Sequence, residues 1–357
     1  MTNIEHLTIG LDLGDKMSEV CVLDTNQKEI RSDGIATNQE SFAALFATYP
    51  GATLVFEVGS QSRWVQALAR ESGLGKVITA DPRQIKLITH SRNKTDRRDA
   101  YLLARIGQGL PELLSQVDHR SESVHADLHV LRTRELLVAQ RTQLVNRVRG
   151  MMKATGRKIT GCTATYFFRQ ARPHIPEHLL TSCAPLFAML EAIHAQLLVI
   201  KRVLRELLEK YPAAKQLMSV PSVGDKTALT FVLTIDNPNR IRSNRNAGAY
   251  LGLVPRKKES GDSSPQLGIT KAGDTRLRRL LVLCAHHLLA RGKDCRLKRW
   301  GLMLCERGGT NAKKRAAVAV ARKLSVHMLA IWKTGEVYDR TRGLPELAKA
   351  MALVETA

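Results

Sequence analysis

Asn93-Lys94-Thr95-Asp96-Arg97-Arg98-Asp99-Ala100, residues 93–100, places two acids three positions apart. Thr95 is a favourable N-cap residue, and the apolar residues after it follow helical spacing. We therefore expect a helix whose first turn carries Asp96 and Asp99 on one face, where the positive end of the helix dipole favours carboxylates. Taken alone, these two acids are equally typical of a solvent-exposed helix start without a chemical role. The acids further upstream distinguish that interpretation from a functional acidic site.

The residues before this helix predict a sheet. Leu7, Ile9, Leu11 and Leu13 alternate with polar or small residues, which indicates a strand with its apolar side chains on one face and Asp12 on the other. The same patterns predict strands at residues 20–23, 30–35, 53–58 and 76–80 and helices at 41–49 and 63–70. Three consecutive strands this short predict an antiparallel meander. Three strands followed by alternating helix and strand is the order of an α/β ribonuclease-H-like (RuvC-like) domain.

In that layout the acids converge. Asp12 lies on the first strand and Glu57 near the end of the fourth, and these two strands are neighbours in a ribonuclease-H-like sheet. Together with Asp96 and Asp99 they form four carboxylates, which need a cation to stay ionised at close range, and hard oxygen ligands suit Mg²⁺ or Mn²⁺. Two such ions about 4 Å apart orient a nucleophile and stabilise charge on a phosphodiester leaving oxygen. The alternative is a turn residue at Asp12 and an exposed edge charge at Glu57.

Charge divides the chain into two unlike parts. Its 357 residues carry a net charge of +22, which indicates a polyanionic partner. Residues 1–115 hold 13 basic and 14 acidic side chains, whereas residues 116–357 hold 42 and 19. Six scattered cysteines without a CxxC pair predict reduced thiols and neither disulfides nor zinc. No signal peptide and no apolar run of membrane length is recognisable, so we expect a soluble protein of the cytosol that is not associated with a membrane.

The middle of the chain, residues 116–211, predicts an α-helical coiled-coil arm. Apolar residues recur every four and three positions from Leu186 to Tyr211, and a weaker series in the same register runs from Val124 to Met152. Glycines and prolines between residues 153 and 182 are typical of a loop-rich tip joining two antiparallel helices. The hairpin either stands alone or also pairs protomers, and we favour pairing because an isolated two-helix arm buries little surface.

The rear, residues 212–357, predicts a mainly α-helical nucleic-acid-binding domain. Residues 220–228 have the form of a helix-hairpin-helix turn that exposes backbone N–H groups to phosphate, although its apolar residues also suit a core helix. Between residues 240 and 299 there are 15 basic and 4 acidic side chains, which indicates phosphate neutralisation and salt-sensitive binding. The predicted nucleic-acid contacts are Gly224, Lys226, Thr227, Arg256, Lys257, Lys258, Lys271, Arg276, Arg278 and Arg279.

A serine-rich loop in this domain raises a second chemical question. Ser260, Ser263 and Ser264 lie in a polar stretch that any exposed turn resembles, and no histidine stands beside them as a base. In phosphoryl transfer, however, Arg and Lys bind the phosphate while metal ions held by another domain supply charge stabilisation. Spacing alone does not choose among the three serines.

With these motifs in view, the sequence resembles the DEDD transposases of bacterial insertion sequences, family one hundred and ten. These pair a RuvC-like N-terminal domain with a C-terminal transposase domain that contains a serine. The resemblance covers nearly the whole chain, and the Asn-Lys-Thr-Asp box and the Glu-Ser-Gly box at this separation are its most specific features. It rests on residues 9–12, 56–57, 93–100, 221–224, 252–256, 259–261, 271–273 and 277–279.

The resemblance implies a DNA transposase or recombinase with three domains, at residues 1–115, 116–211 and 212–357. It implies that Asp12, Glu57, Asp96 and Asp99 are the acidic tetrad that binds two Mg²⁺ ions, for which Mn²⁺ substitutes, and that Ser260 is the nucleophile. It further implies donor and target DNA as partners, a structured noncoding guide RNA encoded by the element, and a homo-oligomer between dimer and tetramer. The segment from Asp262 to Thr270 matches the family less clearly.

Two other functions fit parts of the sequence. A metal-dependent nuclease of the RuvC-like Holliday-junction resolvase type would use water as its nucleophile, and Ser260 would then be only a loop residue. A noncatalytic nucleic-acid scaffold or a decayed copy of the element is the third possibility, and the intact tetrad speaks against it.

Overall fold

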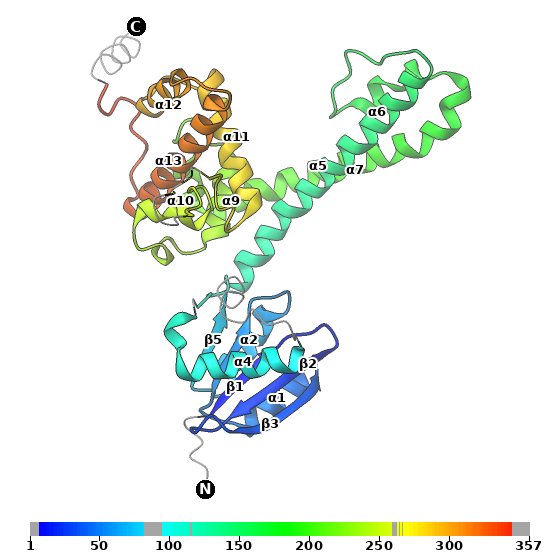
Figure 1. Ribbon diagram of the computed structural model, residues 1–357. Coiled ribbons are helices and arrows are strands. Elements are labelled where there is room, and N and C mark those ends of the chain that lie inside the picture. Colours follow the sequence, from blue (N-terminus) through cyan, green and yellow to red (C-terminus); the bar gives the residue numbers. More distant parts are fainter. Residues whose placement is uncertain are drawn as a thin grey trace. The chain divides into compact units, whose positions relative to one another are not determined.

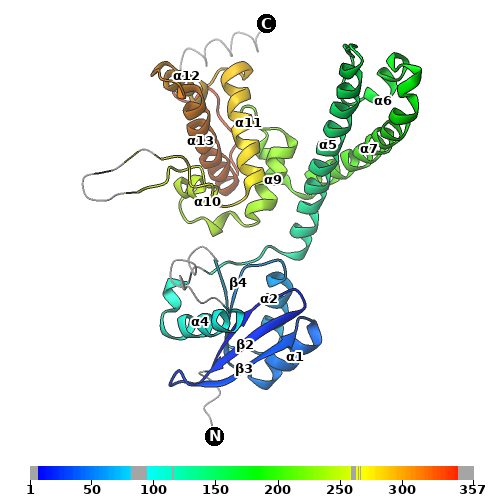
Figure 2. The same cartoon turned by 45° about the vertical axis from the view of Figure 1, so that its right-hand side comes forward.

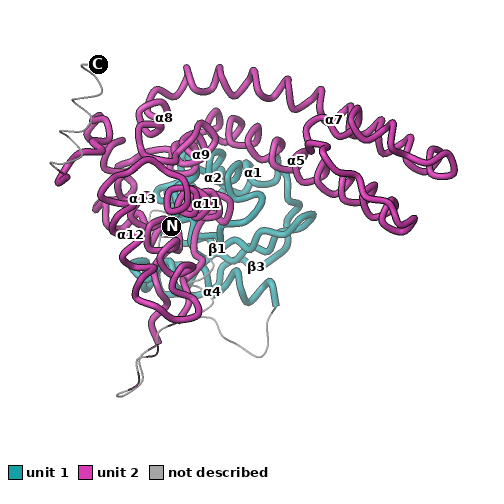
Figure 3. Tube along the Cα trace, turned by 90° about the horizontal axis from the view of Figure 1, so that it is seen from above, with its two compact units in different colours: residues 1–119 teal, residues 120–357 magenta. Residues whose placement is uncertain are grey.

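The computed structural model describes residues 7–81, 95–114, 116–258, 263, 265 and 267–344. The chain forms two compact units, residues 1–119 and 120–357 (Figure 3). Each unit has its own hydrophobic core. All six cysteines are free thiols, as the sequence predicted.

The first unit is built on a five-stranded mixed sheet. Its strands lie in the order β3-β2-β1-β4-β5, with β1 antiparallel to β2 and parallel to β4 (Figure 1). The predicted antiparallel run of three strands and the predicted neighbourhood of the first and fourth strands are both confirmed. The strands are β1 (Thr8–Asp12), β2 (Met17–Leu23), β3 (Glu29–Ala36), β4 (Thr53–Glu57) and β5 (Lys76–Ala80).

Helices cover both faces of this sheet (Figure 1). Helices α1 (Gln39–Thr48) and α2 (Ser62–Glu71) bury the face formed by Ile9, Leu11 and their neighbours. Helix α4 (Asp96–Gly109) covers the opposite face, and the 3-10 turn η2 (Pro111–Leu113) follows it. The alternation of apolar and polar residues in β1 therefore separates two helical layers, because successive side chains of a strand point to opposite faces.

Small residues let α4 lie directly on the sheet. A Cβ atom added at Gly10 of β1 would overlap the carbonyl oxygen of Ala100, and one added at Gly107 of α4 would overlap the side chain of Val55. Backbone approaches this close leave no room for a larger side chain. Gly10 and Gly107 therefore fix the distance between α4 and strands β1 and β4.

The second unit contains two long helices, α5 (Glu122–Ala154) and α7 (Glu177–Lys210). They run antiparallel, since Lys210 at the end of α7 pairs with Asp127 near the start of α5 at 2.7 Å. Residues 155–176 join them and include α6 (Phe167–Gln170) and the 3-10 turn η3 (Arg172–His174) (Figure 2). We call α5, α7 and this connection the arm.

The two helices of the arm bury their seam only at its two ends. Leu128 and Leu204 belong to the core of the C-terminal helices, whereas Val145 and Leu190 belong to a separate core at the far end, which we call the tip, residues 145–190. Between these cores, Leu136, Leu198 and Val199 have 58%, 48% and 49% of their surface exposed. The middle of the arm therefore presents apolar side chains to solvent.

The expectation that no apolar run of membrane length occurs is wrong for α7. By length and composition this helix qualifies as a candidate membrane span, although only 22% of its most apolar 18-residue window is buried inside the protein. The window is apolar because the helix supplies residues to both cores and exposes further apolar residues between them. Helices of soluble proteins can be as long and as apolar, so α7 is only weak evidence for a membrane location.

The remaining helices of the second unit share one large core with the start of α5 and the end of α7, which we call the root of the arm. Helix α13 is central to it, because it contacts α8, α10, α11 and α12. These helices are α8 (Pro212–Leu217), α9 (Asp225–Ile235), α10 (Ala247–Tyr250), α11 (Thr275–Arg291), α12 (Arg296–Glu306) and α13 (Ala312–Thr334), with 3-10 turns η4 (Pro238–Arg240) and η5 (Asn244–Asn246). A mixed α/β sheet unit and a helical C-terminal region agree with the predicted fold class.

Candidate active site

Asp12 and Glu57 end two neighbouring parallel strands. Leu11 of β1 pairs with Phe56 of β4, so the next residue of each strand is an acid. Both carboxylates are half-buried. Because parallel strands end at the same edge of a sheet, the backbone pairing alone brings the two acids together.

The same two acids lie on the face of the sheet that α4 covers. Asp12 follows Gly10 by two residues and Glu57 follows Val55 by two, and both Gly10 and Val55 meet α4. Side chains two apart on a strand share a face. The strand pattern therefore directs both carboxylates toward the layer that contains Asp96 and Asp99.

Helix α4 begins as its sequence predicts. The Thr95 hydroxyl accepts a hydrogen bond from the Arg98 backbone N–H at 3.3 Å, and Asp96 and Asp99 occupy the first turn. Asp96 is exposed and Asp99 is half-buried. The Arg97 guanidinium turns to β3, where it donates to the Ser32 hydroxyl at 2.6 Å.

The direction of α4 brings its first turn to the acidic edge of the sheet. Ala100 lies over Gly10, and further along the helix the Gln108 side chain donates to the Asp24 carbonyl oxygen at 2.7 Å. Asp24 follows β2 at the opposite edge, where Leu23 pairs with Thr8. Helix α4 therefore runs antiparallel to β1, and its N-terminus points to the edge where Asp12 and Glu57 lie.

The ligand chemistry of these four acids suits a hard divalent cation, but their described side chains are not already arranged around one ion. Their donors are all carboxylate oxygens, which is the ligand type that Mg²⁺ and Mn²⁺ prefer. Among the residues that the structure describes, no three His, Cys, Asp or Glu side chains are grouped closely enough to hold a metal ion. The backbone thus places the acids at one edge and on one face of the sheet. Side-chain rotations would have to bring the carboxylates together around one ion.

A fifth acid at this edge escaped the sequence reasoning. Glu19 of β2 is the direct partner of Asp12 across the antiparallel pair, so it shares the α4 face. It is half-buried, and its carboxylate lies beside Gly34 of β3. The strand pairing at β2 was the signal that would have revealed it.

The thiol that packs against α4 is not a nucleophile candidate at neutral pH. Cys21 lies on the α4 face of β2, against Ala100 and Ala104. Burial raises the pKa of Cys21 to about 11, and the Glu29 carboxylate adds to the rise. A thiol with such a pKa remains protonated and unreactive.

The predicted nucleophile Ser260 lies outside the described residues, but the bases of its loop are described. Val254 and Thr270, and Arg256 and Gly268, are joined by backbone hydrogen bonds of 2.9 Å, so two short antiparallel segments flank the serine loop. Gly252 lies where the two segments begin and end, just before Val254 and beside Ala272. It has φ +66°, and a Cβ atom there would overlap the Ala272 backbone. Glycine is therefore required where the two segments cross.

Three predicted nucleic-acid contacts lie at the start of α9, in different environments. Gly224 is the N-cap of α9 and faces open space. Lys226 is half-buried and pairs with Asp225 at 3.3 Å. Thr227 is buried, and its hydroxyl lies 3.4 Å from the Cys284 sulfur. Only the exposed backbone at Gly224 and the Lys226 side chain are accessible to a ligand.

The basic residues around the serine loop and at the start of α11 also divide into two groups. Arg256, Lys257, Lys258 and Lys271 are exposed. Arg276 and Arg279 are exposed too, but both pair with Glu135 of α5, at 3.0 and 2.9 Å. These two pairs connect α11 to the arm.

Arg278 is buried, with 8% of its surface exposed. Its guanidinium donates to the carbonyl oxygens of Leu251 at 3.2 Å and Ala272 at 2.6 Å, and to the Thr275 hydroxyl at 3.0 Å. This side chain therefore holds α11 to the foot of the serine loop, and it offers no exposed donor to a phosphate.

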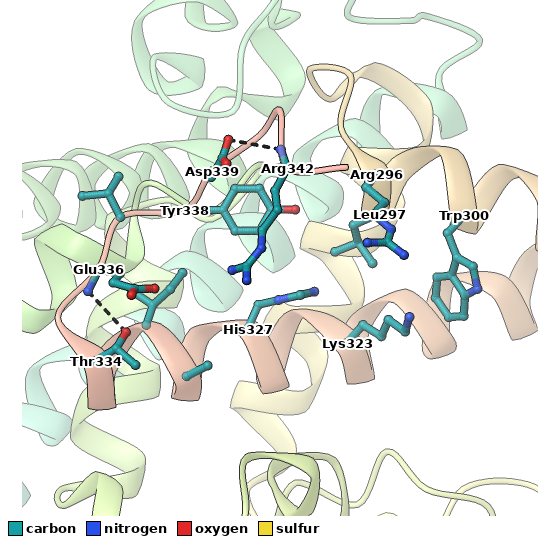
Figure 4. Close-up of a pocket in the computed structure, with 13 residues that line it drawn as sticks. Arg296, Leu297, Trp300, Lys323, His327, Thr334, Glu336, Tyr338, Asp339 and Arg342 are labelled. Atoms are coloured by element: carbon teal, nitrogen blue, oxygen red, sulfur yellow. Dashed lines mark hydrogen bonds between the residues drawn. The ribbon is translucent and has the colours of Figure 1, made fainter. Parts of the chain in front are cut away.

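A cavity of about 1000 Å³ lies in the C-terminal helical region, and none of the predicted site residues that the structure describes lines it (Figure 4). It is lined by α12, α13 and the segment after α13, with Trp300 and Tyr338 on its walls. The Lys323 ammonium lies 4.2 Å from the centre of the Trp300 ring. Burial lowers the pKa of His327 in its wall, and the nearby Lys323 adds to this effect. The cavity therefore does not mark the acidic site.

Two stretches of the chain match known protein families. Residues 9–156 match the transposase family designated DEDD_Tnp_IS110, and residues 214–299 match the family described as "Transposase IS116/IS110/IS902 family". Together these matches span more than half of the 357 residues. The first match contains all four acids of the predicted tetrad.

Named relatives extend over most of the chain. It is 27% identical over 343 residues to the "Transposase for insertion sequence element IS1111A" of Coxiella burnetii, covering 92% of this chain and 90% of the relative. It is 27% identical over 331 residues to the "Probable family 20 transposase" of Pseudomonas aeruginosa, covering 88% and 93%. A transposase for element IS1328 of Yersinia enterocolitica is 28% identical over 229 residues, or 63% and 68%.

These matches define the class of the protein, which is a transposase, an enzyme that cleaves and rejoins DNA. Within this class, the chain belongs to the IS110/IS116 family of insertion-sequence transposases.

Proposed function

We propose that this transposase is a divalent-metal-dependent recombinase whose acidic tetrad is Asp12, Glu57, Asp96 and Asp99 and whose nucleophile is Ser260. The observation that carries the proposal is the placement of two strand-end acids and the acidic first turn of α4 at one edge and on one face of the sheet. The order of strands β3-β2-β1-β4-β5 supports a RuvC-like, ribonuclease-H-like domain. We retain three functional parts, at residues 1–115, 116–211 and 212–357.

The tetrad Asp12, Glu57, Asp96 and Asp99 would hold divalent cations through carboxylate oxygens, the ligand type that Mg²⁺ prefers. Bound divalent ions, two Mg²⁺ with Mn²⁺ as a substitute, supply charge stabilisation at a scissile phosphate. The Asp and Glu side chains hold these ions and exclude competing anions by their own negative charge. Glu19, which shares their face, adds negative charge that strengthens the need for a cation.

Ser260 would carry the covalent step. Its oxygen attacks the phosphorus of a DNA strand, an O–P bond forms to the serine, and the bond from phosphorus to the leaving DNA oxygen breaks. The serine proton is lost to solvent and the leaving oxygen takes up a proton. In the reverse step a hydroxyl from a second DNA end attacks the phosphoserine, so the strands are exchanged without net loss of a phosphodiester.

The exposed cations near the serine loop would bind the DNA that the serine attacks. Arg256, Lys257, Lys258 and Lys271 are exposed, and their neutralisation of phosphates predicts salt-sensitive binding. The turn at Gly224 and Lys226 has the form of a helix-hairpin-helix contact with a phosphate. We propose no such contact for Arg278 and Thr227, because both side chains are buried. A structured guide RNA encoded by the element is proposed as a second partner on the strength of the family resemblance.

The arm would pair protomers. Leu136, Leu198 and Val199 form an exposed apolar stretch between its two cores, which a second copy of the arm would bury. Since the tetrad and Ser260 lie in different parts of the chain, a dimer or tetramer allows carboxylates from one protomer to act with the serine of another. Such an oligomer would work on nucleoid DNA in the bacterial cytoplasm.

A trapping experiment tests the nucleophile. Purified protein is incubated with Mg²⁺ and a DNA substrate from the element end, quenched with denaturant, and examined by gel for a covalent protein-DNA adduct. We expect an adduct with the unmodified protein and with Ser263→Ala, and none with Ser260→Ala. Cleavage without any adduct, unaffected by Ser260→Ala, would instead identify a resolvase-type nuclease that uses water.

A further inference from the structure

We propose that the tip of the arm is a binding surface for unpaired nucleotides of a nucleic acid. The first observation is its charge. The tip, residues 145–190, contains seven Lys and Arg and a single acid, Glu177. A run this one-sided attracts a polyanion, and it lies far along the chain from the cations that flank Ser260. The inference rests on the proposed function only in taking nucleic acid as the polyanion.

The cations of the tip are available to a ligand. All seven are exposed, and none of the seven forms an ion pair with any residue that the structure describes. This contrasts with Arg276 and Arg279, whose charges are neutralised by Glu135. The seven are Arg147, Arg149, Lys153, Arg157, Lys158, Arg169 and Arg172.

Aromatic rings fix the positions of three of these charges. Arg149 lies over the Phe167 ring at 5.4 Å, and its Nη2 also donates to the Cys162 carbonyl oxygen at 3.1 Å. Arg169 lies over Phe168 at 5.2 Å, and Arg172 lies over a third phenylalanine of the tip core at 5.8 Å. A guanidinium group held over a ring loses less freedom when it binds a phosphate. The tip therefore presents ordered positive charge.

An exposed aromatic ring adjoins these charges. Tyr166 has 49% of its surface exposed, and its ring lies 5.2 Å from the His194 ring of α7. The His194 ring lies 5.3 Å from Phe168, over which Arg169 sits. A ring that is supported from below and open above can stack with a base, and only an unpaired base offers its face. Cations around an exposed aromatic ring thus favour single strands over a duplex.

The tip is also a folded unit in its own right within the arm. Its core, which includes Val148, Phe167 and Phe187, is separate from the core of the C-terminal helices. The Gln170 side chain accepts the Thr163 backbone N–H at 2.8 Å and so fastens the loop that carries Tyr166. The charged and aromatic groups are therefore fixed by local contacts, and substitutions at exposed positions leave the rest of the chain intact.

Fluorescence anisotropy with the full-length protein tests the inference. The probes are a 20-nucleotide single-stranded RNA, the single-stranded DNA of the same sequence, and the corresponding DNA duplex, all measured without Mg²⁺ so that cleavage plays no part. We expect Tyr166→Ala to weaken binding of single strands by about 5- to 150-fold, because that is the range measured for one lost stack. Tyr166→Phe keeps the ring and should bind as the unmodified protein does.

The charge is tested by the double substitution Arg157→Gln and Lys158→Gln. It should reduce the slope of log affinity against log salt by about 1.4 for single strands, since each lost contact removes about 0.7. The matched control is Lys201→Gln with Arg202→Gln, which we call the shaft control. It removes two exposed charges from the part of α7 outside the tip and should leave the slope unchanged. Whichever single strand binds tighter identifies RNA or DNA as the source of the unpaired nucleotides.

Three results would overturn the inference: unchanged single-strand binding in Tyr166→Ala, an equal loss for the duplex, or an equal change of slope in the shaft control. An equal loss for the duplex would show a general contact with the phosphate backbone. The outcome is independent of the Ser260 trapping result. If no covalent adduct forms but the tip variants lose single-strand binding, the tip inference stands while the serine mechanism fails.

Discussion

The acids of the N-terminal sheet and the cations of the C-terminal helices are positioned in different ways. Asp12 and Glu57 are aligned by the pairing of β1 with β4, so the backbone alone determines where they lie. The cations depend on which partner each finds. Arg278 is taken up by protein carbonyls and Arg279 by Glu135, whereas Arg256 remains exposed. Strand register thus identifies a candidate catalytic acid, whereas a basic residue must be judged by its contacts.

The largest expected effect is at Asp12. Asp12→Asn removes one negative charge at the edge of the sheet and should reduce strand cleavage by at least about 100-fold, since even residues that only support a metal ligand cost 10- to 100-fold. Mg²⁺ binding, measured by isothermal titration calorimetry, should weaken in parallel. The control is Asp15→Asn, an exposed acid in the turn after β1, which should retain both properties. Cleavage and Mg²⁺ binding that survive Asp12→Asn would remove the catalytic role of the sheet.

The second prediction tests whether the backbone really sets the position of α4. Gly10→Val would force its side chain into the Ala100 carbonyl and the Ala104 side chain. We expect the free energy of unfolding to fall by about 3 kcal/mol, which is the upper range for overpacking a core, and cleavage to fall with it. The measurement is urea denaturation followed by circular dichroism. Gly59→Ala, where an added methyl group meets nothing within 4 Å, should unfold as the unmodified protein does.

The third prediction separates buried from exposed cations. Arg278→Gln leaves the carbonyl oxygens of Leu251 and Ala272 without their donor and should lower the free energy of unfolding by about 1–3 kcal/mol. Arg256→Gln with Lys258→Gln should leave stability unchanged. Instead it should reduce the salt slope of duplex binding by about 1.8, at about 0.9 for each lost phosphate contact.

The two variants must show opposite profiles for this distinction to hold. Thermal unfolding monitors the first property, and anisotropy of a labelled duplex at several salt concentrations monitors the second. If Arg278→Gln were stable but bound DNA with a reduced slope, the buried guanidinium would have to reach phosphate after all.

The smallest expected effect concerns a surface ion pair. Hydrogen bonds from Arg299 lower the pKa of Asp294, and Arg299 Nη2 lies 2.7 Å from Asp294 Oδ2. A carboxyl whose folded pKa lies below its unfolded value stabilises the protein above the unfolded pKa and loses that contribution as pH falls through the folded pKa. Because the pair is exposed, Asp294→Asn should cost less than about 1 kcal/mol at pH 7. Unfolding measured at acidic pH should show the difference from the unmodified protein shrink toward pH 2.

The sequence predicted the sheet well because its signals are local. Alternation in β1 distinguished the Ile9 face from the Asp12 face, and Thr95 marked the start of α4. Placement of Asp12 beside Glu57 needed only the neighbourhood of the first and fourth strands. Glu19 escaped because its role depends on the antiparallel register of β2 with β1, which single-strand patterns do not fix.

The environments of the basic residues were not predictable from their own segments. Arg278 and Arg279 are adjacent in sequence, yet one is buried and the other is exposed beside Glu135, which lies 144 residues away. Likewise, the seam of the arm has an unbroken apolar spacing from Leu186 to Tyr211, although burial is interrupted between Ile193 and Leu204. Contacts between distant segments decide both features, and a local pattern contains no record of them.

The interrupted seam gives the arm a modular construction. One core closes the arm at residues 124–131 of α5 and another closes its tip, and no residue is buried between Leu131 and Val145 of α5 or between Ile193 and Leu204 of α7. Matched helical turns can therefore be added to or removed from both helices without disturbing either core. The reach of the tip can thus evolve independently of the folds at the two ends. Related transposases are expected to differ in arm length by amounts that preserve the helical phase.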